Sequence, residues 1–344
     1  SHGEPISTPD TAIDLLTERL WALLQARGEN PRLFQLRAEP YIRLSPHLLW
    51  NRTSLAYGYA LLSKSGKALL FDYGYDFTTG PAAGSDRASR RPWLYTLPML
   101  KQGFGVTEIE AVLPTHYHDD HVAGCNLLRA AEGAQVWASE RFADILEAPA
   151  RYDLPCLWHD PISVDRRLPL EQPFRWQEYE LTLHPLPGHT THAVAIFLEV
   201  DGQRVLIAGD QYQNGREAKW NYVYNNGFHL SDYAASAGLF RQLRPDLVLS
   251  GHWEPYRVEP GYLETLERRG QTLRDLHQDL LLPETWASVG GDRLLKLEPY
   301  QSAVAPGGSF VLSATLTRGL EKPQEARLRL ELPEGWRSEP DEVR

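Results

Sequence analysis

The sequence predicts an α/β fold in which helices cover β-sheets. The chain has 344 residues, 42% of them hydrophobic, which is enough to bury one large domain and a smaller one. In its middle part, short apolar runs typical of strands alternate with stretches of helical periodicity, a pattern that places sheets under helices. The expected strands are 111–113, 181–184, 205–208 and 247–249, and the expected helices are 119–131, 231–243 and 262–281.

The N-terminal part predicts a helix followed by antiparallel strands. Apolar residues recur at helical spacing over 11–27, and Gly28 lies just beyond as a stop signal. Three β-like runs follow, and the turn-like Lys64-Ser65-Gly66 joins the last two. These runs are 41–50, 55–63 and 67–73.

The composition changes after Pro283, where we expect a domain boundary between 1–282 and 283–344. Beyond it lie β-like runs at 294–297, 310–317 and 326–332. With Pro306-Gly307-Gly308 between them, these runs resemble the start of an Ig-like domain of the kind appended to secreted bacterial enzymes. About three strands precede Arg344, whereas an Ig sandwich needs about seven. The alternative is a set of surface strands that completes the main fold.

Charge and composition narrow the classes of partner. The net charge is −10, and the acidic residues are scattered, so we expect no nucleic-acid partner and instead a small-molecule substrate. No apolar run approaches the roughly 18 residues that cross a bilayer, and no signal-like stretch opens the chain. A cytoplasmic enzyme and a secreted bacterial enzyme both remain open, as does the oligomeric state.

The chain contains only two cysteines, Cys125 and Cys156. Without a CxxC pattern, neither a thiolate zinc finger nor a disulfide framework is expected. We interpret both residues as buried free thiols, with a single bridge as the alternative.

Three histidines and an aspartate crowd one predicted turn. The strand 111–113 stops at Pro114, which cannot continue a central strand. The donors that follow are His116, His118, Asp120 and His121. Imidazole and carboxylate together suit zinc, iron or manganese, whereas calcium and magnesium prefer sites of oxygen ligands alone. The sequence therefore predicts a transition-metal site after this strand.

Further donors stand near the ends of three distant strands. His189, Asp210 and His252 each follow an apolar run, and each comes directly after a glycine. Glycine lets backbone approach an ion closely, and the carboxyl ends of strands are where open α/β folds place their ligands. We expect these three residues to converge on the turn at 114–121.

With these residues in order, the sequence resembles the metallo-β-lactamase superfamily, whose pattern is HxHxDH followed by a later His, an Asp and a final His. The resemblance covers roughly 40–255 and includes Phe71-Asp72-Tyr73-Gly74, where the family carries Asp-x-Gly. It implies an αββα sandwich and two divalent metal ions, zinc first, with iron or manganese as alternatives. It also implies the ligands: His116, His118 and His189 for one metal, Asp120, His121 and His252 for the other, and Asp210 as a bridge.

Neighbouring polar residues are interpreted as non-ligands. Asp72 would orient the ligand turn, and Asp119 would be solvated or would cap a helix, since negative charge favours a helix start. His192 lies three residues after His189 and would line the pocket or support a ligand.

The expected chemistry is hydrolysis by a metal-bound hydroxide, with Asp120 binding the second metal and orienting the attacking oxygen. The bond attacked would be an ester, thioester, lactam or phosphodiester. Two other classes compete with this hypothesis. One is an iron-dependent oxidoreductase of the same superfamily, such as a persulfide dioxygenase, and the other is a binding module that has lost catalysis.

The segment 211–229 predicts a long loop beside the metals, because it leaves directly from Asp210. Loops of more than about 12–15 residues in compact domains are usually functional or disordered. This one mixes aromatic and amide side chains, as ligand pockets do. The candidate substrate contacts are Tyr212, Trp220, Tyr222 and Tyr224, together with His192; the alternative is that the aromatic side chains only pack the loop onto the core.

Overall fold

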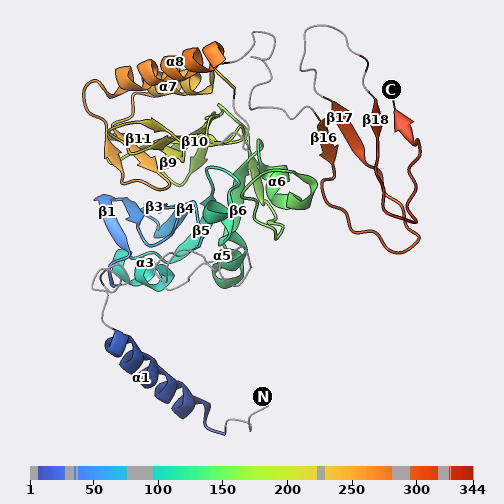
Figure 1. Ribbon diagram of the computed structural model, residues 1–344. Coiled ribbons are helices and arrows are strands. Elements are labelled where there is room, and N and C mark those ends of the chain that lie inside the picture. Colours follow the sequence, from blue (N-terminus) through green and yellow to red (C-terminus); the bar gives the residue numbers. More distant parts are fainter. Residues whose placement is uncertain are drawn as a thin grey trace.

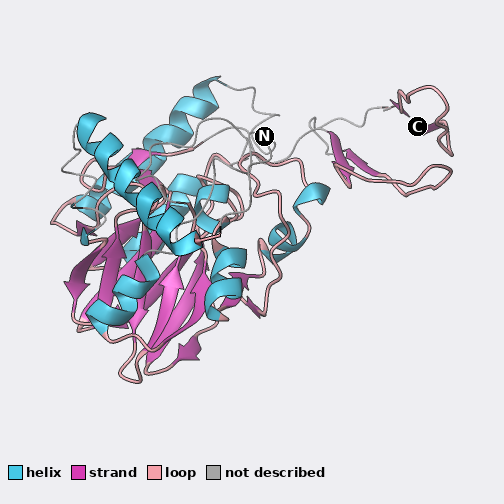
Figure 2. Cartoon of the chain, turned by 90° about the horizontal axis from the view of Figure 1, so that it is seen from below, coloured by secondary structure: helices cyan, strands magenta, loops and turns pink. Residues whose placement is uncertain are grey.

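The computed structural model describes residues 7–27, 35, 38–75, 96–222, 229–280, 295–316, 325 and 327–343. Two mixed β-sheets face each other, and helices cover their outer faces (Figure 1). The four layers are stacked from top to bottom in Figure 1, and the view from below in Figure 2 shows helices in front of the strands. This is the αββα sandwich that the resemblance implied.

The first sheet is seven-stranded, with the strands in chain order. The pairs β1–β2, β2–β3 and β3–β4 are antiparallel, whereas the pairs β4–β5, β5–β6 and β6–β7 are parallel. The expected run 41–50 is in fact a hairpin of two strands. The bounds are β1 Tyr41–Ser45, β2 Leu48–Asn51, β3 Gly58–Leu62, β4 Lys67–Phe71, β5 Glu108–Leu113, β6 Gln135–Ser139 and β7 Arg166–Leu168.

The second sheet is six-stranded, in the order β15-β14-β11-β10-β9-β8, and only β11 and β14 are parallel to each other. Its strands are β8 Phe174–Trp176, β9 Tyr179–Pro185, β10 Val194–Val200, β11 Gln203–Gly209, β14 Leu247–Ser250 and β15 Tyr256–Arg257. A separate hairpin pairs β12 Tyr212–Gln213 with β13 Lys219–Trp220.

Buried side chains on the two faces of the second sheet belong to two separate hydrophobic cores. In β11, Val205 and Ile207 belong to the cluster between the two sheets, whereas Leu206 and Ala208 belong to a second cluster under the helices. Successive side chains of a strand point to opposite faces, so a strand with both faces covered is apolar throughout. Phe240 of α7 is among the helix residues that close the second cluster.

Helices lie outside both sheets. Figure 1 shows α3 and α5 beside the first sheet and α7 and α8 over the second. The described helices are α1 Pro9–Arg27, α3 Thr96–Phe104, α4 Asp119–Val122, α5 Cys125–Glu132, α6 Ala143–Glu147, α7 Asp232–Leu243 and α8 Tyr262–Leu280, with a short 3-10 helix at Pro149–Arg151.

The helix expected over 119–131 is broken into α4 and α5 between Val122 and Cys125. Gly124 lies at the break, where its N–H donates to the carbonyl of Tyr73 at 2.9 Å. A Cβ at this position would come within 2.4 Å of the Tyr73 ring. The close approach to the segment after β4 therefore determines where the first helix ends.

The C-terminal part forms two small antiparallel sheets, β16 Leu295–Glu298 with β17 Ser313–Leu316, and β18 Leu328–Arg329 with β19 Glu342–Val343. It contacts the main fold near the 3-10 helix, where the N–H of Tyr300 donates to the carbonyl of Arg151 at 3.0 Å. The expected boundary near 283 lies outside the described residues, and the Ig-like domain stays a prediction.

Candidate metal centre

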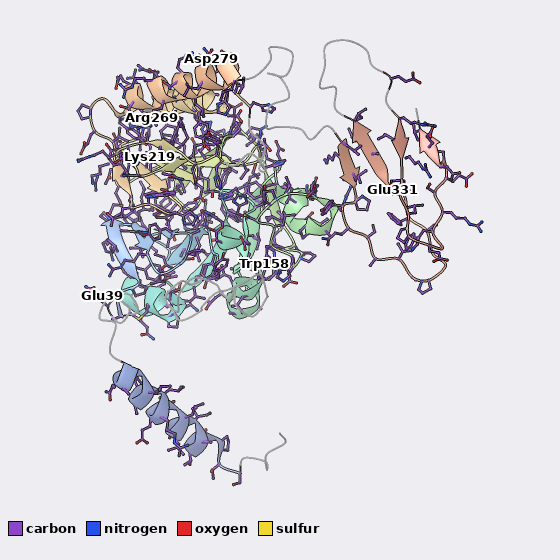
Figure 3. All side chains as sticks on the ribbon, viewed as in Figure 1. Glu39, Trp158, Lys219, Arg269, Asp279 and Glu331 are labelled. Carbon is purple, nitrogen blue, oxygen red and sulfur yellow. The ribbon has the colours of Figure 1, made fainter. Side chains whose placement is uncertain are left out.

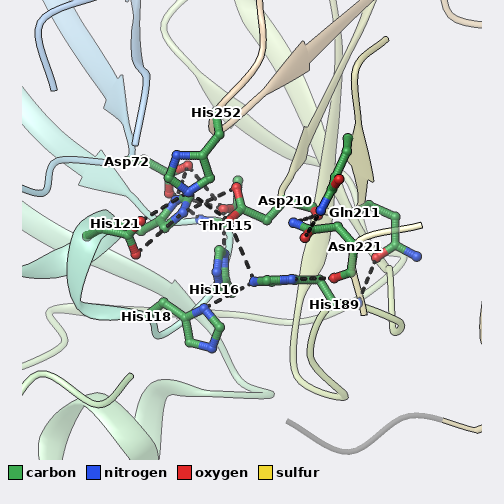
Figure 4. A network of polar contacts seen from close by, with 12 residues as sticks. Asp72, Thr115, His116, His118, His121, His189, Asp210, Gln211, Asn221 and His252 are labelled. Atoms are coloured by element: carbon green, nitrogen blue, oxygen red, sulfur yellow. Dashed lines mark hydrogen bonds and ion pairs between the residues drawn. The ribbon is translucent and has the colours of Figure 1, made fainter. Parts of the chain in front are cut away.

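Seven His and Asp side chains meet at one edge of the sandwich, and six of them are labelled in Figure 4. The turn after β5 carries four of them, and β9, β11 and β14 each lead to one more. Carboxyl ends of strands from both sheets thus meet at this edge, as the sequence predicts. The residues are His116, His118, Asp120, His121, His189, Asp210 and His252.

A first group of three buried histidines can hold one ion. The possible ligand atoms of His116, His118 and His189 all lie within 4.8 Å of one another. His118 Nδ1 lies 3.1 Å from His189 Nε2, so these two nitrogens point at the same place. Three imidazoles around one point are a familiar zinc arrangement.

A second group, beside the first, includes a carboxylate. Asp120, His121 and His252 also have ligand atoms within 4.8 Å of one another. His252 Nε2 lies 3.1 Å from Asp120 Oδ2. This set of one carboxylate and two imidazoles can hold a second ion.

The Asp210 carboxylate lies between the two groups. Its Oδ2 is 3.5 Å from His189 Nε2, and it is also 3.0 Å from His252 Nε2. Its Oδ1 is 3.4 Å from His121 Nε2. One buried carboxylate therefore reaches nitrogen atoms of both groups, as a bridging ligand would.

Polar contacts at Nδ1 orient four of the five imidazoles, three of them through hydrogen bonds and His121 through an ion-pair contact. His189 Nδ1 lies 2.6 Å from the carbonyl oxygen of Asn221, and His252 Nδ1 lies 3.0 Å from that of Leu55. A carbonyl only accepts, so Nδ1 carries a proton in both rings, and Nε2 is the nitrogen that could bind an ion. His121 Nδ1 lies 3.0 Å from Asp72 Oδ2, and His116 Nδ1 lies 3.1 Å from Thr115 Oγ1. Such partners fix the ring orientation in metal sites.

The two groups differ in their electrostatics. Burial holds the pKa of His116 well below its usual value and lowers the pKa of His118 to about 3, so these two imidazoles are neutral. Burial also lowers the pKa of His252, but Asp210 and Asp120 outweigh it and raise the pKa to about 10. The second group therefore combines negative carboxylates with imidazoles that attract protons, and a metal cation would take the place of those protons.

Buried nitrogen atoms without a hydrogen-bond partner indicate whether this set of residues suits a metal ion. Within the described ranges, His116 Nε2 and His121 Nε2, one from each group, are buried and have no hydrogen-bond partner. A buried polar atom without a partner costs roughly 1–3 kcal/mol. A bound cation would remove that cost, so the donor set fits a transition-metal ion.

The glycines before the later ligands leave room for side chains of neighbouring residues. A Cβ at Gly251 would lie 2.1 Å from Asp210 Oδ1, and one at Gly188 would lie 2.4 Å from the Gln211 amide. Gly209 has a φ of +49°, and a Cβ there would lie 2.7 Å from Thr115 Oγ1. A larger residue at any of these positions would therefore displace a side chain of the site, and the approach of backbone to an ion stays a prediction.

Asp72 acts on the ligand turn as expected. Its Oδ1 accepts a hydrogen bond from the backbone N–H of Thr115 at 2.7 Å, in addition to its contact with His121. The solvated position expected for Asp119 is wrong: its side chain is buried, in the first turn of α4. This turn lies under the loop that follows the 3-10 helix, and the N–H of Asp119 donates to the carbonyl of Cys156.

The residues expected to contact substrate differ in how deeply the structure buries them. Tyr212 is buried against Tyr233 and Phe240 in the second core, which favours the packing alternative for that residue. Trp220 and Tyr222 are half-buried beside the same cluster. Tyr224 lies outside the described residues. The segment expected as a long loop begins with the β12–β13 hairpin, which Lys219 marks in Figure 3.

Sequence reasoning gave Asn221 no specific role. Its carbonyl accepts from His189, and its Nδ2 donates to the carbonyl of Asp210 at 2.7 Å. Gln213 Nε2 holds the Asn221 amide at 2.9 Å, and the N–H of Asn221 donates to Tyr233 Oη at 3.1 Å. An isolated Asn in a loop carries no local signal for this role, because the contacts exist only in the folded chain.

Cys125 and Cys156 do not form a disulfide with each other. Cys125 is buried, as expected, whereas Cys156 is exposed, so the expectation that both are buried is wrong for Cys156. Cys156 lies on the loop after the 3-10 helix and not in a core element.

The fold and the clustered donors define a class, the αββα sandwich with a His/Asp metal centre at one edge. The family model of the metallo-beta-lactamase superfamily matches residues 59–252, from β3 to the last proposed ligand. The chain belongs to this superfamily.

Solved structures share the fold at low identity. The metallo-β-lactamase from Pontibacter korlensis is 19% identical, with 67% of this chain and 98% of that chain covered and a TM-score of 0.51. A metallo-β-lactamase from Cronobacter sakazakii is 18% identical, with 72% of this chain and 98% of that chain covered and a TM-score of 0.53.

Curated relatives match over shorter segments. A hydroxyacylglutathione hydrolase from Albidiferax ferrireducens is 35% identical over 104 residues, which are 30% of this chain and 34% of that protein. A probable metallo-hydrolase from Streptococcus pyogenes is 30% identical over 107 residues, 29% of this chain and 45% of that protein. The matches therefore span less than half the length of either relative.

None of the helices in the described part of the chain combines the length and the apolar character needed to cross a lipid bilayer.

Proposed function

We propose that this protein is a metal-dependent hydrolase with two divalent ions, preferably zinc, and that it acts on a small-molecule substrate. His116, His118 and His189 would hold one ion, Asp120, His121 and His252 the other, and Asp210 would bind both. The observation that carries the proposal is the position of Asp210, whose carboxylate lies within 3.5 Å of nitrogens from both groups. The names of the curated relatives support hydrolysis as the reaction class.

When bound, two such ions supply a water that is acidic enough to attack at neutral pH and a positive charge for the oxyanion that develops. The residues of this chain hold the ions and the attacking water in position. Asp120 stands beside His252 and has its second oxygen 3.9 Å from His121 Nε2, so it can also accept a hydrogen bond from the attacking water. The outer partners of the imidazoles keep the site in place through the reaction.

The attacked bond would be an ester, thioester or lactam, with a phosphodiester as an alternative. We would test zinc-loaded protein against one substrate of each kind, using metal-free protein as the control. Zinc-dependent turnover of at least one substrate is the expected result. Iron-dependent oxygen consumption with a persulfide, and no hydrolysis, would favour the oxidoreductase alternative instead. The carboxylate in the second group argues against that alternative, since it completes a site for a second ion.

A further inference from the structure

A cationic side chain lies at the edge of the sandwich that carries the metal centre. β5 and β6 are parallel, so their carboxyl ends meet at one edge. β5 leads to the ligand turn, and β6 ends at Ser139, two residues before Arg141. The topology thus places Arg141 beside the turn that holds four of the seven proposed ligands.

Hydrogen bonds tie Arg141 to the segment that follows His189. Its guanidinium donates to the carbonyl of Thr191, two residues beyond that ligand. In return, the Arg141 carbonyl accepts from His192 Nδ1 at 3.1 Å. The His192 ring lies 5.9 Å from the Tyr117 ring, which in turn lies 4.9 Å from the ring of His118. Arg141, His192 and Tyr117 therefore form a continuous wall that ends at a metal ligand.

The guanidinium lacks an anionic partner among the described residues. It is half-buried, its Nε is buried without a hydrogen-bond partner, and no described carboxylate oxygen lies within 4.0 Å of it. Asp232 is near enough to influence the Arg141 charge, but its Oδ2 already accepts from the N–H of His229 at 2.6 Å. A partly buried cation without a paired anion is costly.

Positive charge acts on the imidazole beside Arg141, although the whole chain carries a net charge of −10. Burial does most to lower the pKa of His192, and the positive charges of Arg141 and Lys296 lower it further. Lys296 Nζ lies 4.0 Å from Glu298 Oε2, so the charge of Lys296 is partly balanced. Arg141 is therefore the cation that is left to attract an anion beside His192.

We propose that Arg141 binds a carboxylate carried by the substrate and so determines which substrates the metal centre accepts. The planar guanidinium matches a carboxylate in shape and charge. This proposal rests on the hydrolase function proposed above, because it assigns a specificity group to the same site.

The test compares two acyl esters of equal chain length, 4-nitrophenyl hydrogen glutarate with a terminal carboxylate and 4-nitrophenyl valerate without one. We expect Arg141→Met to lower kcat/KM for the glutarate ester roughly tenfold or more, mainly through KM, and to leave the valerate ester unchanged. Arg141→Lys, which keeps the charge but not the planar group, should fall between. Arg216→Met is the matched control, because Arg216 is exposed and pairs with Glu259. Metal content is measured for every variant.

An equal loss on both esters would show that Arg141 only supports the turn after His189, and no loss on either ester would also overturn the proposal. A second measurement does not depend on turnover: metal-free protein is titrated with glutarate by calorimetry. Wild type should bind glutarate at least roughly tenfold more tightly than Arg141→Met. If zinc-loaded wild type cleaves neither ester, the hydrolase proposal fails for esters, and the titration still decides the carboxylate site. If wild type does not bind glutarate better than the variant, the site is absent.

Discussion

Asp210 concentrates the chemistry of the centre in one side chain. It is buried, and its pKa is held well below the usual value because His121 and His252 outweigh the effect of burial. A carboxylate that is charged at neutral pH and faces two imidazole groups is ready to bind cations on both sides. Its sequence signal is modest, a single Gly-Asp pair at the end of a strand, yet the ordering of the other donors was enough to predict it.

Asp210→Asn should therefore disturb both ions, because the amide has the same shape but no charge. Loss of an outer partner typically lowers metal affinity 10–100-fold, and we expect this substitution to cost more than that for each ion. Mass spectrometry of the metal content would measure it. Asp246→Asn is the control, since Asp246 is a half-exposed partner of Arg204 that precedes β14, whereas the ligand His252 follows that strand. Full occupancy and unchanged turnover in Asp210→Asn would refute the bridging role.

The second prediction at the residue scale concerns the glycine before His252. Gly251→Ala would place a methyl group 2.1 Å from Asp210 Oδ1 and 2.7 Å from His121 Cε1, so the carboxylate must move. We expect a drop in metal affinity of roughly tenfold or more, comparable to the loss of an outer partner. Gly238→Ala in α7 meets no atom within 4 Å, and in a helix it should stabilise the protein by up to about 1 kcal/mol. If the two alanine variants bound zinc equally well, the crowding argument would fail.

At the scale of elements, periodicity predicted the long helices and the central strands well. α7 and α8 begin and end within one residue of their predicted limits. The break between α4 and α5 was missed because it depends on the approach of Tyr73 to Gly124, a contact between segments far apart in the sequence. The β12–β13 hairpin was missed for a different reason. Its strands have only two residues each, too few for a period of two to show.

This hairpin leads directly to Asn221, whose hydrogen bonds join two proposed ligands. Asn221→Asp keeps the shape but replaces the Nδ2 donor with an oxygen that faces the carbonyl of Asp210. We expect zinc affinity to fall roughly 10–100-fold while the protein stays folded. A cobalt-substituted sample should show an altered absorption spectrum, which a purely structural loss elsewhere would not produce. Unchanged affinity and spectrum would mean that the hairpin only covers the site.

At the scale of the whole molecule, the sequence predicted the sandwich and all the proposed ligands through a family resemblance, which the match over 59–252 confirms at the level of the superfamily. The supporting groups were less predictable. Asp72 was expected from its Asp-x-Gly context, but Thr115 and Asn221 gain their roles only when β5, β9 and β11 come together. The aromatic residues of 212–222 were ambiguous because pocket walls and cores use the same side chains, and the structure places Tyr212 in a core.

Metal binding should also stabilise the whole fold, because the proposed ligands come from both sheets. At a free zinc concentration of 100 times Kd, binding to the native state alone contributes about 2.7 kcal/mol per site. Chelation should therefore lower Tm, and added zinc should restore it. A Tm that is the same with and without chelator would contradict the placement of the ions between the sheets.

The proposed centre for two ions can be examined by counting metal atoms per chain in purified protein that has been supplied with zinc and iron together. We expect close to two transition-metal ions per chain, mainly zinc, held by two groups that share Asp210. A content near one iron per chain, accompanied by oxygen consumption, would contradict it.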